Sequence, residues 1–553
     1  MPSSTPSNMP DPGACAYPLL IKQLLHTPLA VRPEQEIVYG DNVRHDYRTF
    51  HARIGQLAGL LQSLGVKPGD TVAVMDWDSH RYLESYFAVP MIGAVLMMVN
   101  IRLAPEQIAY TLNHSGARVI LANREFLPVL EGIHEQLPDV RTRILLDDAG
   151  GPLPEGFAAE YEAGLRHAEP VTHFPDFDEN TCATTFYTTG TTGLPKGVYF
   201  SHRQLVLHSL SAMAALGSAP AQGRLHRDDV YMPITPMFHV HAWGVPYVAT
   251  LMGIKQVYPG RYVPARLLEL IRREKVTFSH CVPTILHMLL SDATAADTDL
   301  RGWKVIIGGA ALPRGLAQQA LARGIDIFGG YGMSETCPVL TLAQVDVEAL
   351  VGTDEELSLR TKAGMPIPLV DLRIVDEDMN DVAHDGNATG EVVVRAPWLT
   401  QGYLHNPDAS AALWAGGYLH TGDIGNIDAG GYLRVTDRIK DVIKTGGEWI
   451  SSLALEDIIA MHPAVNEVAV IGIADEKWGE RPLPLVVRHA GCDVSEAELI
   501  ELVAARSRSG DISRYAIPER IRFVDAIERT SVGKINKKKL RSLHDLPVEL
   551  RSS

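Results

Sequence analysis

Short apolar segments alternate with amphipathic segments over the first two thirds of the chain, and this alternation most constrains the fold. Strand-like runs at 71–75, 118–121 and 304–307 are separated by segments with apolar residues at helical spacing, such as the one from Ile54 to Leu64. Strands that alternate with helices form parallel sheets covered by helices on both faces. The sequence therefore predicts an α/β fold with parallel-rich sheets.

Two of the predicted strands end in pairs of glycines. The run 304–307 is followed by Gly308 and Gly309, and the run 325–328 is followed by Gly329 and Gly330. In open α/β sheets, ligands bind beyond the carboxyl ends of the strands. We therefore expect these glycines to form walls of one crevice.

The pattern changes after about residue 364. Short strands separated by turn-rich segments predict a smaller, partly antiparallel, β-barrel-like unit over about 364–435, and a mixed segment of helices and strands follows it. A chain of 553 residues also exceeds what one hydrophobic core usually supports. The predicted parts are a flexible tail, a large N-terminal domain that includes the barrel-like unit, and a small α+β C-terminal domain, at residues 1–16, 17–439 and 440–553.

Composition excludes some classes of function. A net charge of −16 argues against a general nucleic-acid binder, although local lysines can still hold a small anion. Five cysteines without CxxC spacing indicate neither a zinc site nor a disulfide framework, and reduced thiols are typical of a cytosolic protein. No run approaches the roughly 18 apolar residues of a membrane span. We expect a cytoplasmic protein without a nucleic-acid partner or stable membrane insertion.

Residues 187–197 read Tyr-Thr-Thr-Gly-Thr-Thr-Gly-Leu-Pro-Lys-Gly and combine four threonines, three glycines and one lysine. Glycine lets backbone approach a ligand closely, and hydroxyl, amide and ammonium groups suit a polyphosphate. The loop is not a Walker A motif, because Pro195 and Gly197 flank Lys196. A phosphate-binding loop and an ordinary surface loop are both open interpretations at this point.

Two further segments carry residues suited to a nucleotide. Tyr331 lies between glycines, where its ring can stack on a flat base, and Glu335 follows as a possible Mg²⁺ ligand. Asp423, in the sequence His-Thr-Gly-Asp, can accept hydrogen bonds from ribose hydroxyls. The alternatives are a capped strand-end turn for the first segment and an ordinary turn aspartate for the second.

The segment 236–244 places His239 and His241 beside bulky apolar side chains. A metal site would need a third ligand, and no HExxH-like spacing supplies one. A pocket lined by Phe238 and Trp243, with His239 at its polar mouth, is one interpretation, and a buried core histidine is the other.

Near the end of the chain, Lys534 follows a glycine in a turn rich in threonine and serine, just before a run of lysines. A lysine at the tip of such a turn can approach an anion that other residues already hold. The alternative is that the whole run is a solvated basic face.

Taken together and in this order, the motifs resemble the adenylate-forming superfamily of acyl-CoA synthetases, luciferases and peptide-synthetase adenylation domains. The resemblance runs from about Tyr39 to Arg541. Residues 74–80, 444–451 and 530–536 narrow it to medium- and long-chain fatty acyl-CoA synthetases. It implies a mobile C-terminal domain and an ATP- and Mg²⁺-dependent ligation of a medium- to long-chain carboxylic acid to coenzyme A through an acyl-adenylate.

The resemblance also implies roles for individual residues. Lys534, His239 and Glu335 would be catalytic, and Thr188 and Glu335 would hold Mg²⁺. The implied nucleotide-binding residues are Thr188, Thr189, Gly190, Thr191, Thr192, Lys196, Gly308, Gly309, Gly330, Tyr331, Gly332, Ser334, Asp423, Arg438, Lys444 and Trp449. The hinge, the acyl pocket with its gate, and the coenzyme A path would be formed by Lys440, by Val240 with Trp243, and by Gly446 with Gly447.

Two positions depart from the superfamily pattern. Ser334 replaces the usual threonine and keeps the hydroxyl, and Glu528 replaces a common proline in the segment that leads to Lys534. The alternatives to a fatty acyl-CoA ligase are an enzyme that loads a carrier protein, a ligase for a short or sulfur-containing acid, and a regulator with a degenerate nucleotide site. A homodimer is compatible with the resemblance.

Overall fold

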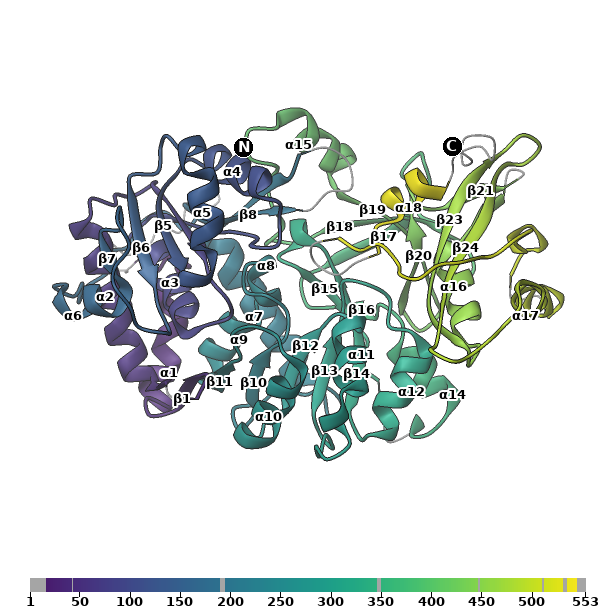
Figure 1. The fold of residues 1–553 in the computed structure, drawn as a ribbon, viewed down its shortest axis with the longest axis horizontal. Helices are drawn as coiled ribbons and strands as arrows, with labels where there is room; N and C mark the ends of the chain where they lie inside the picture. The colour runs from purple at the N-terminus through teal and green to yellow at the C-terminus, as the bar shows by residue number, and fades with distance from the viewer. Residues whose placement is uncertain are drawn as a thin grey trace, which may run out of the picture.

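The computed structural model of the protein describes residues 16–41, 43–188, 194–345, 350–445, 448–509, 512–530 and 535–544. Figure 1 shows a large N-terminal domain and a smaller C-terminal domain, each with strands and helices. Most strand pairs in the two large sheets are parallel, as the alternating pattern predicts. The predicted α/β class is confirmed.

A seven-stranded sheet forms one half of the N-terminal domain, in the order β7-β6-β5-β3-β4-β8-β9. All pairs are parallel except β8 with β9, which form an antiparallel hairpin at the edge. The strands are β3 (Thr71–Met75), β4 (Val95–Met98), β5 (Ala117–Asn123), β6 (Thr142–Leu146), β7 (Ala159–Glu160), β8 (Cys182–Thr188) and β9 (Lys196–Ser201). The helices of this half are α2 (Tyr47–Ser63), α3 (His80–Met91), α4 (Pro105–His114), α5 (Leu127–Ile133) and α6 (Tyr161–His167).

A nine-stranded sheet forms the other half, in the order β16-β15-β14-β13-β12-β10-β11-β1-β2, with a parallel centre and antiparallel edges. Its strands are β1 (Glu36–Tyr39), β2 (Val43–Asp46), β10 (Val230–Pro233), β11 (Lys255–Tyr258), β12 (Phe278–Cys281), β13 (Lys304–Ile307), β14 (Asp326–Gly332), β15 (Val339–Leu342) and β16 (Met365–Pro366). Its helices are α1 (His26–Val31), α7 (His202–Ser218), α8 (Val240–Trp243), α9 (Val245–Met252), α10 (Pro264–Glu274), α11 (Pro283–Ser291), α12 (Arg314–Ala322) and α14 (Asp354–Arg360).

Helix α3 packs against strands of both large sheets, and all 12 of its residues are buried. The helix carries charged residues, which are costly to bury unless they are paired and hydrogen-bonded. Glu84 accepts hydrogen bonds from Arg53 Nε at 2.6 Å and from the Tyr161 hydroxyl at 2.6 Å. These bonds to α2 and α6 allow a polar helix to lie in the core.

The predicted barrel-like unit contains a four-stranded antiparallel sheet, β17 (Asp371–Val375), β18 (Gly390–Arg395), β19 (Leu419–Ile427) and β20 (Leu433–Arg438), with α15 (Pro407–Leu413) between β18 and β19. The strands pair in the order β17-β18-β19-β20. In the described part of the chain, β17 and β20 do not pair with each other, so this sheet is not closed into a barrel.

Two segments for which a turn is the alternative interpretation lie within strands. Strand β14 continues through its glycines to Gly332, because Tyr331 pairs with Thr341 of β15. The His-Thr-Gly-Asp segment lies inside β19, where Asp423 pairs with Arg438 of β20. Gly422 lies in this strand with a φ of +68°, a left-handed conformation that is typical of turns and that glycine adopts easily.

The C-terminal domain is built around the long antiparallel pair β23 (Val465–Asp475) and β24 (Gly479–Arg488). The other elements are β21 (Ile443–Thr445), β22 (Glu448–Ile450), β25 (Arg522–Phe523), α16 (Ser452–Ala460), α17 (Glu496–Arg508) and α18 (Lys537–His544). Helices α16 and α18 both contact β23. In the described ranges, no helix is long and apolar enough to cross a membrane.

Candidate active site

The threonine/glycine loop begins and ends on the β8–β9 hairpin. Thr188 and Lys196 are directly paired across the two strands, so a hydroxyl and an ammonium group lie at the same end of the sheet. Thr189, Gly190, Thr191 and Thr192 lie outside the described residues. Lys196 Nζ is 4.6 Å from the ring centroid of Tyr403, a cation–π distance.

Glu335 lies in the turn that follows β14 and is buried, with 7% of its surface exposed. Its Oε1 accepts a hydrogen bond from the Tyr403 hydroxyl at 2.6 Å, and its backbone oxygen accepts one from the Thr400 N–H at 3.0 Å. Tyr403 therefore lies between Lys196 and Glu335. Tyr403 belongs to no sequence motif of the site, because Glu335 is 68 residues away and only the fold brings them together.

Tyr331, Asp423 and Arg438 form a second cluster. The Tyr331 hydroxyl donates to Asp423 Oδ2 at 2.7 Å, and Arg438 Nε lies 3.0 Å from Asp423 Oδ1. Burial and the Asp423 charge raise the pKa of Tyr331, so the hydroxyl stays protonated. The charge of Asp423 raises the pKa of Arg438, and Glu335 acts in the same direction. Tyr331 lies near the end of β14 and Glu335 lies in the turn that follows this strand, so one segment carries a member of each cluster.

The glycines that follow β13 and lie in β14 are required by close contacts. A Cβ atom on Gly308 would lie 3.0 Å from both Gly330 O and Trp243 Cη2, and one on Gly332 would lie 1.8 Å from Pro338 O. Side chains larger than that of glycine would not fit at these close contacts. Their neighbours in the chain Gly309, Gly330 and Ser334 are partly exposed.

The short element α8, which follows His239, is a left-handed turn and not a regular right-handed helix. Val240, His241, Ala242 and Trp243 have φ values of 49°, 56°, 46° and 58°. Each non-glycine residue in this conformation costs about 1–2 kcal/mol, so the surrounding structure has to hold the turn. Such strain is typical of sites where side chains must be aimed in a defined direction.

Hydrogen bonds before and within the turn hold it. Met237 N donates to Asp78 Oδ1 at 2.8 Å, and Met237 O accepts from the Tyr86 hydroxyl. His241 Nε2 lies 2.8 Å from Thr184 Oγ1, and burial lowers the pKa of His241 to about 3. His241 is therefore the neutral core histidine of the pair, and His239 is the half-exposed one. In the described ranges, no group of three His, Cys, Asp or Glu side chains could hold a metal ion.

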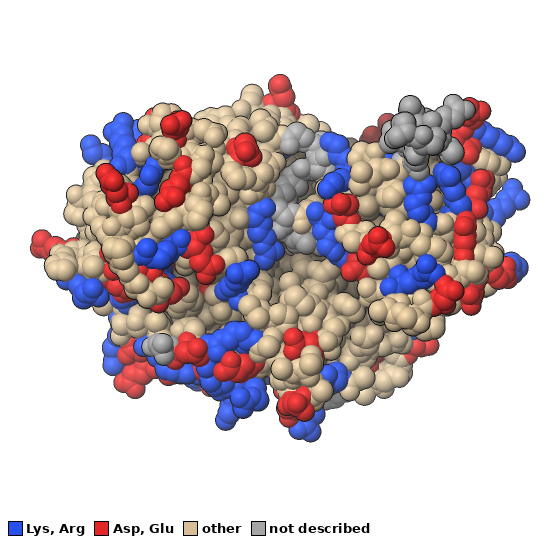
Figure 2. Space-filling view, viewed as in Figure 1, with Lys and Arg blue, Asp and Glu red and all other residues tan. Residues whose placement is uncertain are grey.

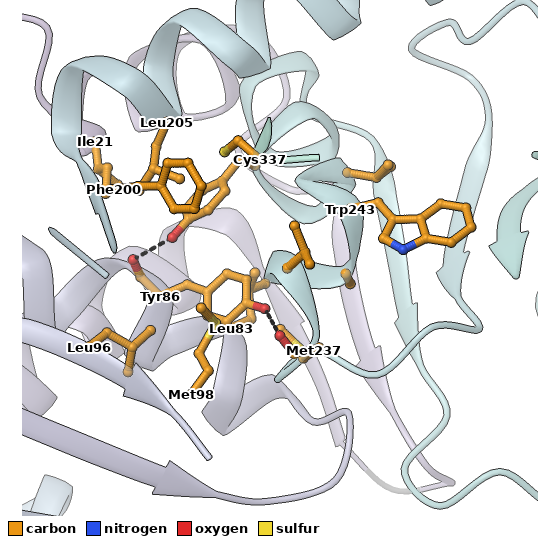
Figure 3. Packing of buried hydrophobic residues seen from close by; sticks show 14 of the residues in the cluster. Ile21, Leu83, Tyr86, Leu96, Met98, Phe200, Leu205, Met237, Trp243 and Cys337 are labelled. Carbon is orange, nitrogen blue, oxygen red and sulfur yellow. Dashed lines mark hydrogen bonds between the residues drawn. The ribbon is translucent and has the colours of Figure 1, made fainter. Parts of the chain in front are cut away.

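Trp243 ends the turn and packs against His280, a histidine that belongs to none of the sequence motifs. Its indole stacks on His280, with ring centroids 4.9 Å apart and planes at 28°. His280 Nε2 lies 2.8 Å from the Tyr231 hydroxyl, and burial lowers the pKa of His280 to about 3. Figure 3 shows Trp243 at the edge of the buried cluster, with its indole turned away from Tyr86. Trp243 thus contacts His280 with its ring face and also lies close to Gly308.

The C-terminal domain carries the other predicted residues. Lys440 and Lys444 are exposed, and Lys444 pairs with Trp449 in the β21–β22 hairpin. Lys534 lies outside the described residues, as do Gly446 and Gly447. The described ends of the segment that carries Lys534 are joined by a bridge between Arg529 and Ile535.

The departure at Glu528 has a structural partner. Lys539 Nζ lies 2.8 Å from Glu528 Oε2, and Asn536 N donates to Glu528 O at 2.8 Å. These contacts constrain the approach to Lys534 where a proline would otherwise do so. Figure 2 shows a hollow between the two domains, with lysine and arginine side chains on both rims.

Known proteins match this chain over nearly its whole length. The family model of AMP-binding enzymes matches residues 25–404, and the model of the C-terminal domain of AMP-binding enzymes matches residues 454–534. A long-chain-fatty-acid–CoA ligase of Thermus thermophilus is 42% identical over 91% of this chain and 90% of its own length. A 3-methylmercaptopropionyl-CoA ligase of Ruegeria lacuscaerulensis is 37% identical over 95% of this chain and 97% of its own length.

A solved structure has the same fold. The crystal structure of an anthranilate CoA ligase in complex with anthranoyl-AMP superimposes with a TM-score of 0.84 at 25% identity and covers 97% of this chain and 99% of its own. The predicted resemblance is therefore confirmed. The chain belongs to the AMP-binding enzyme family, among its AMP-forming acyl-CoA ligases.

Proposed function

We propose that this protein joins a medium- to long-chain fatty acid to coenzyme A, with ATP converted to AMP and pyrophosphate. The observation that carries the proposal is the site from Lys196 through Tyr403 and Glu335 to Arg438 and Asp423, next to the apolar turn at Trp243. The identity to a long-chain-fatty-acid–CoA ligase supports the choice of acid.

In the first step, an oxygen of the substrate carboxylate attacks the α-phosphorus of ATP and pyrophosphate leaves. Lys196 and Thr188, with Thr189, Gly190, Thr191 and Thr192, would bind the departing phosphates. Tyr331, Asp423 and Arg438 would hold the adenosine, with the base in the slot at Gly308, Gly309, Gly330 and Gly332. Positioning and charge stabilisation supply most of the catalysis in phosphate chemistry of this kind.

The donor set fits a magnesium ion that arrives with the nucleotide. Mg²⁺ is usually bound through one or two carboxylates together with substrate phosphates, so the single carboxylate of Glu335 suffices. Glu335 and Thr188 would hold the ion, and when bound it would offset negative charge on the phosphates. Ser334 would contact the α-phosphate, and His239 would lie next to the substrate carboxylate.

In the second step, the thiolate of coenzyme A attacks the carbonyl carbon of the acyl-adenylate, and AMP leaves. Lys534 would contact the carboxylate and α-phosphate in the first step only. The C-terminal domain would then turn about Lys440, so that Lys444, Trp449, Gly446 and Gly447 replace Lys534 and line the coenzyme A path.

The length of the acyl chain that the site accepts would depend on the turn at Val240 and Trp243. Long chains would have to pass Trp243, which now rests on His280. The relative that acts on 3-methylmercaptopropionate makes a short thioether acid the second candidate, because a short acid needs no space behind Trp243.

The test is a series of straight-chain acids from C4 to C18, with 3-methylmercaptopropionate included, assayed with ATP and coenzyme A. AMP and acyl-CoA formation with a maximum between C8 and C16 is the expected result. A maximum at the thioether acid would select the second candidate. Trapping with hydroxylamine in the absence of coenzyme A tests the acyl-adenylate itself, and no hydroxamate with any acid would overturn the proposal.

A further inference from the structure

Tyr403 contacts the two oppositely charged side chains at the phosphate end of the proposed site. Its hydroxyl donates to Glu335 Oε1 at 2.6 Å, and the ring lies 4.6 Å from Lys196 Nζ. Glu335 and Lys196 come from different sheets, so Tyr403 bridges the two halves of the N-terminal domain.

The segment 399–406, which we call the connector, fixes the ring in this position. Leu404 N donates to Gly197 O at 2.8 Å, next to Lys196, and Thr400 N donates to Glu335 O at 3.0 Å. Tyr403 N donates to Ser410 Oγ at 2.8 Å. Both residues that Tyr403 contacts are therefore joined to the connector by backbone hydrogen bonds at or beside them.

The charges around Tyr403 determine what its hydroxyl can do. Burial and the neighbouring Glu335 charge raise the pKa of Tyr403, so the hydroxyl stays a donor to the carboxylate. In the described part of the chain, no donor is hydrogen-bonded to the second oxygen of Glu335, and Lys196 makes no ion pair. A cation–π contact leaves the ammonium hydrogens of Lys196 available to an anion.

We propose that Tyr403 is a positioning residue for the nucleotide-dependent step. It keeps Glu335 and Lys196 from pairing with each other, directs one Glu335 oxygen towards a magnesium ion and presents Lys196 to the β- and γ-phosphates. The proposal rests on the proposed function for the identity of the ligand, and it adds a residue to which the resemblance gives no role.

The first test is Tyr403→Phe, which keeps the ring under Lys196 and removes the hydrogen bond to Glu335. Binding of a non-hydrolysable ATP analogue is measured by titration calorimetry over a series of Mg²⁺ concentrations, without acid or coenzyme A. We expect the half-saturating Mg²⁺ concentration to rise by about tenfold, since loss of a residue that orients a metal ligand weakens metal binding by about 10–100-fold. Analogue binding without Mg²⁺ is expected to stay within about twofold of wild type.

Tyr418→Phe is the matched control, because the Tyr418 hydroxyl also donates to a carboxylate, Asp371 Oδ2 at 2.8 Å, but on the exposed surface of β17. This control is expected to leave the Mg²⁺ dependence unchanged. A second variant, Tyr403→Leu, removes the ring as well and is expected to weaken analogue binding without Mg²⁺ several-fold beyond Tyr403→Phe.

Three outcomes overturn the proposal. The first is a wild-type Mg²⁺ dependence of Tyr403→Phe, and the second is an equal shift in Tyr418→Phe. The third is a wild-type protein that binds no Mg²⁺–nucleotide, which would also overturn the proposed function. If wild type binds the nucleotide but activates no acid, a shift in Tyr403→Phe supports the role of Tyr403 while the proposed function fails. If the first outcome comes with a lowered melting temperature of Tyr403→Phe, the role of Tyr403 is structural.

Discussion

In the N-terminal domain, the site side chains Glu335 and Asp423 are buried and accept hydrogen bonds from other segments, whereas Lys440 and Lys444 of the C-terminal domain are exposed. The described contacts across the predicted hinge lie close to it. Ser452 N donates to Asp437 Oδ2 at 2.6 Å, and Ser451 Oγ donates to Thr436 O. The N-terminal half of the site is thus fixed by its own fold, and the C-terminal half depends on how the domain is placed.

This difference gives a rule for the two half-reactions. A group on the fixed side that holds the AMP part should affect acyl-adenylate formation and thioester formation together, because AMP is held there in both steps. A group on the C-terminal domain should affect only one of them. Four substitutions test this rule and the fixed side itself.

Lys534→Ala has the largest expected effect. The variant is expected to lose about 10²–10³-fold in acyl-adenylate formation, the usual cost of removing one charge-stabilising group. Thioester formation from preformed acyl-adenylate and coenzyme A should stay near the wild-type rate. The two rates are measured separately by pyrophosphate exchange and by acyl-CoA release. Lys538→Ala, in the same basic run, is the control, and equal effects of the two variants would assign Lys534 to a solvated face.

Asp78→Asn tests the fixed side through its stability. Burial raises the pKa of Asp78 to about 7, above the unfolded value near 3.8. The folded protein therefore keeps a proton that the unfolded chain loses, and stability falls as the pH rises from about 4 to 7. Asparagine can still accept from Met237 N and lacks this titration. Between pH 4 and pH 7, the free energy of unfolding of the variant should rise by about 3 kcal/mol relative to that of wild type. Urea unfolding at each pH measures this difference.

A difference in the free energy of unfolding between Asp78→Asn and wild type that stays constant over this pH range would contradict the prediction. It would mean that Asp78 is charged in the folded protein and that its hydrogen bonds from Met237 N and Tyr262, at 2.8 Å and 2.5 Å, offset the burial. Asp70→Asn, at a partly exposed turn, is the control for the chemical change from aspartate to asparagine.

The fold class and most of the strands could be predicted from the sequence, because the spacing of apolar residues and the positions of glycines are local signals. The strand at 304–307 lies where the sequence places it, with the glycine pair directly after it. The left-handed turn after His239 could not be predicted, because none of its four residues is glycine. Tyr403 and His280 could not be predicted either, since their partners Glu335 and Trp243 reach them only through the fold.

Lys440→Pro tests the hinge. Proline fixes φ near −65° and should hinder the rotation that the second step needs. We expect a loss of about tenfold or more in thioester formation, as hinge changes alter the rate of the step they gate, with acyl-adenylate formation kept within about twofold. Lys440→Ala keeps a flexible backbone and serves as the control. Equal loss of both half-reactions in Lys440→Pro would place the hinge elsewhere.

Asp423→Asn has the smallest expected effect and tests the rule from the fixed side. Asparagine keeps one acceptor oxygen for Tyr331 or a ribose hydroxyl but removes the charge next to Arg438. Loss of one hydrogen bond of this kind costs about 1 kcal/mol, or about fivefold. Because Asp423 would hold the nucleoside in ATP and in the acyl-adenylate, the same factor should appear in the KM for ATP and in the KM for preformed acyl-adenylate. A loss in only one of them would show that the fixed side also changes between the two steps, and the proposed division between the two domains would then be wrong.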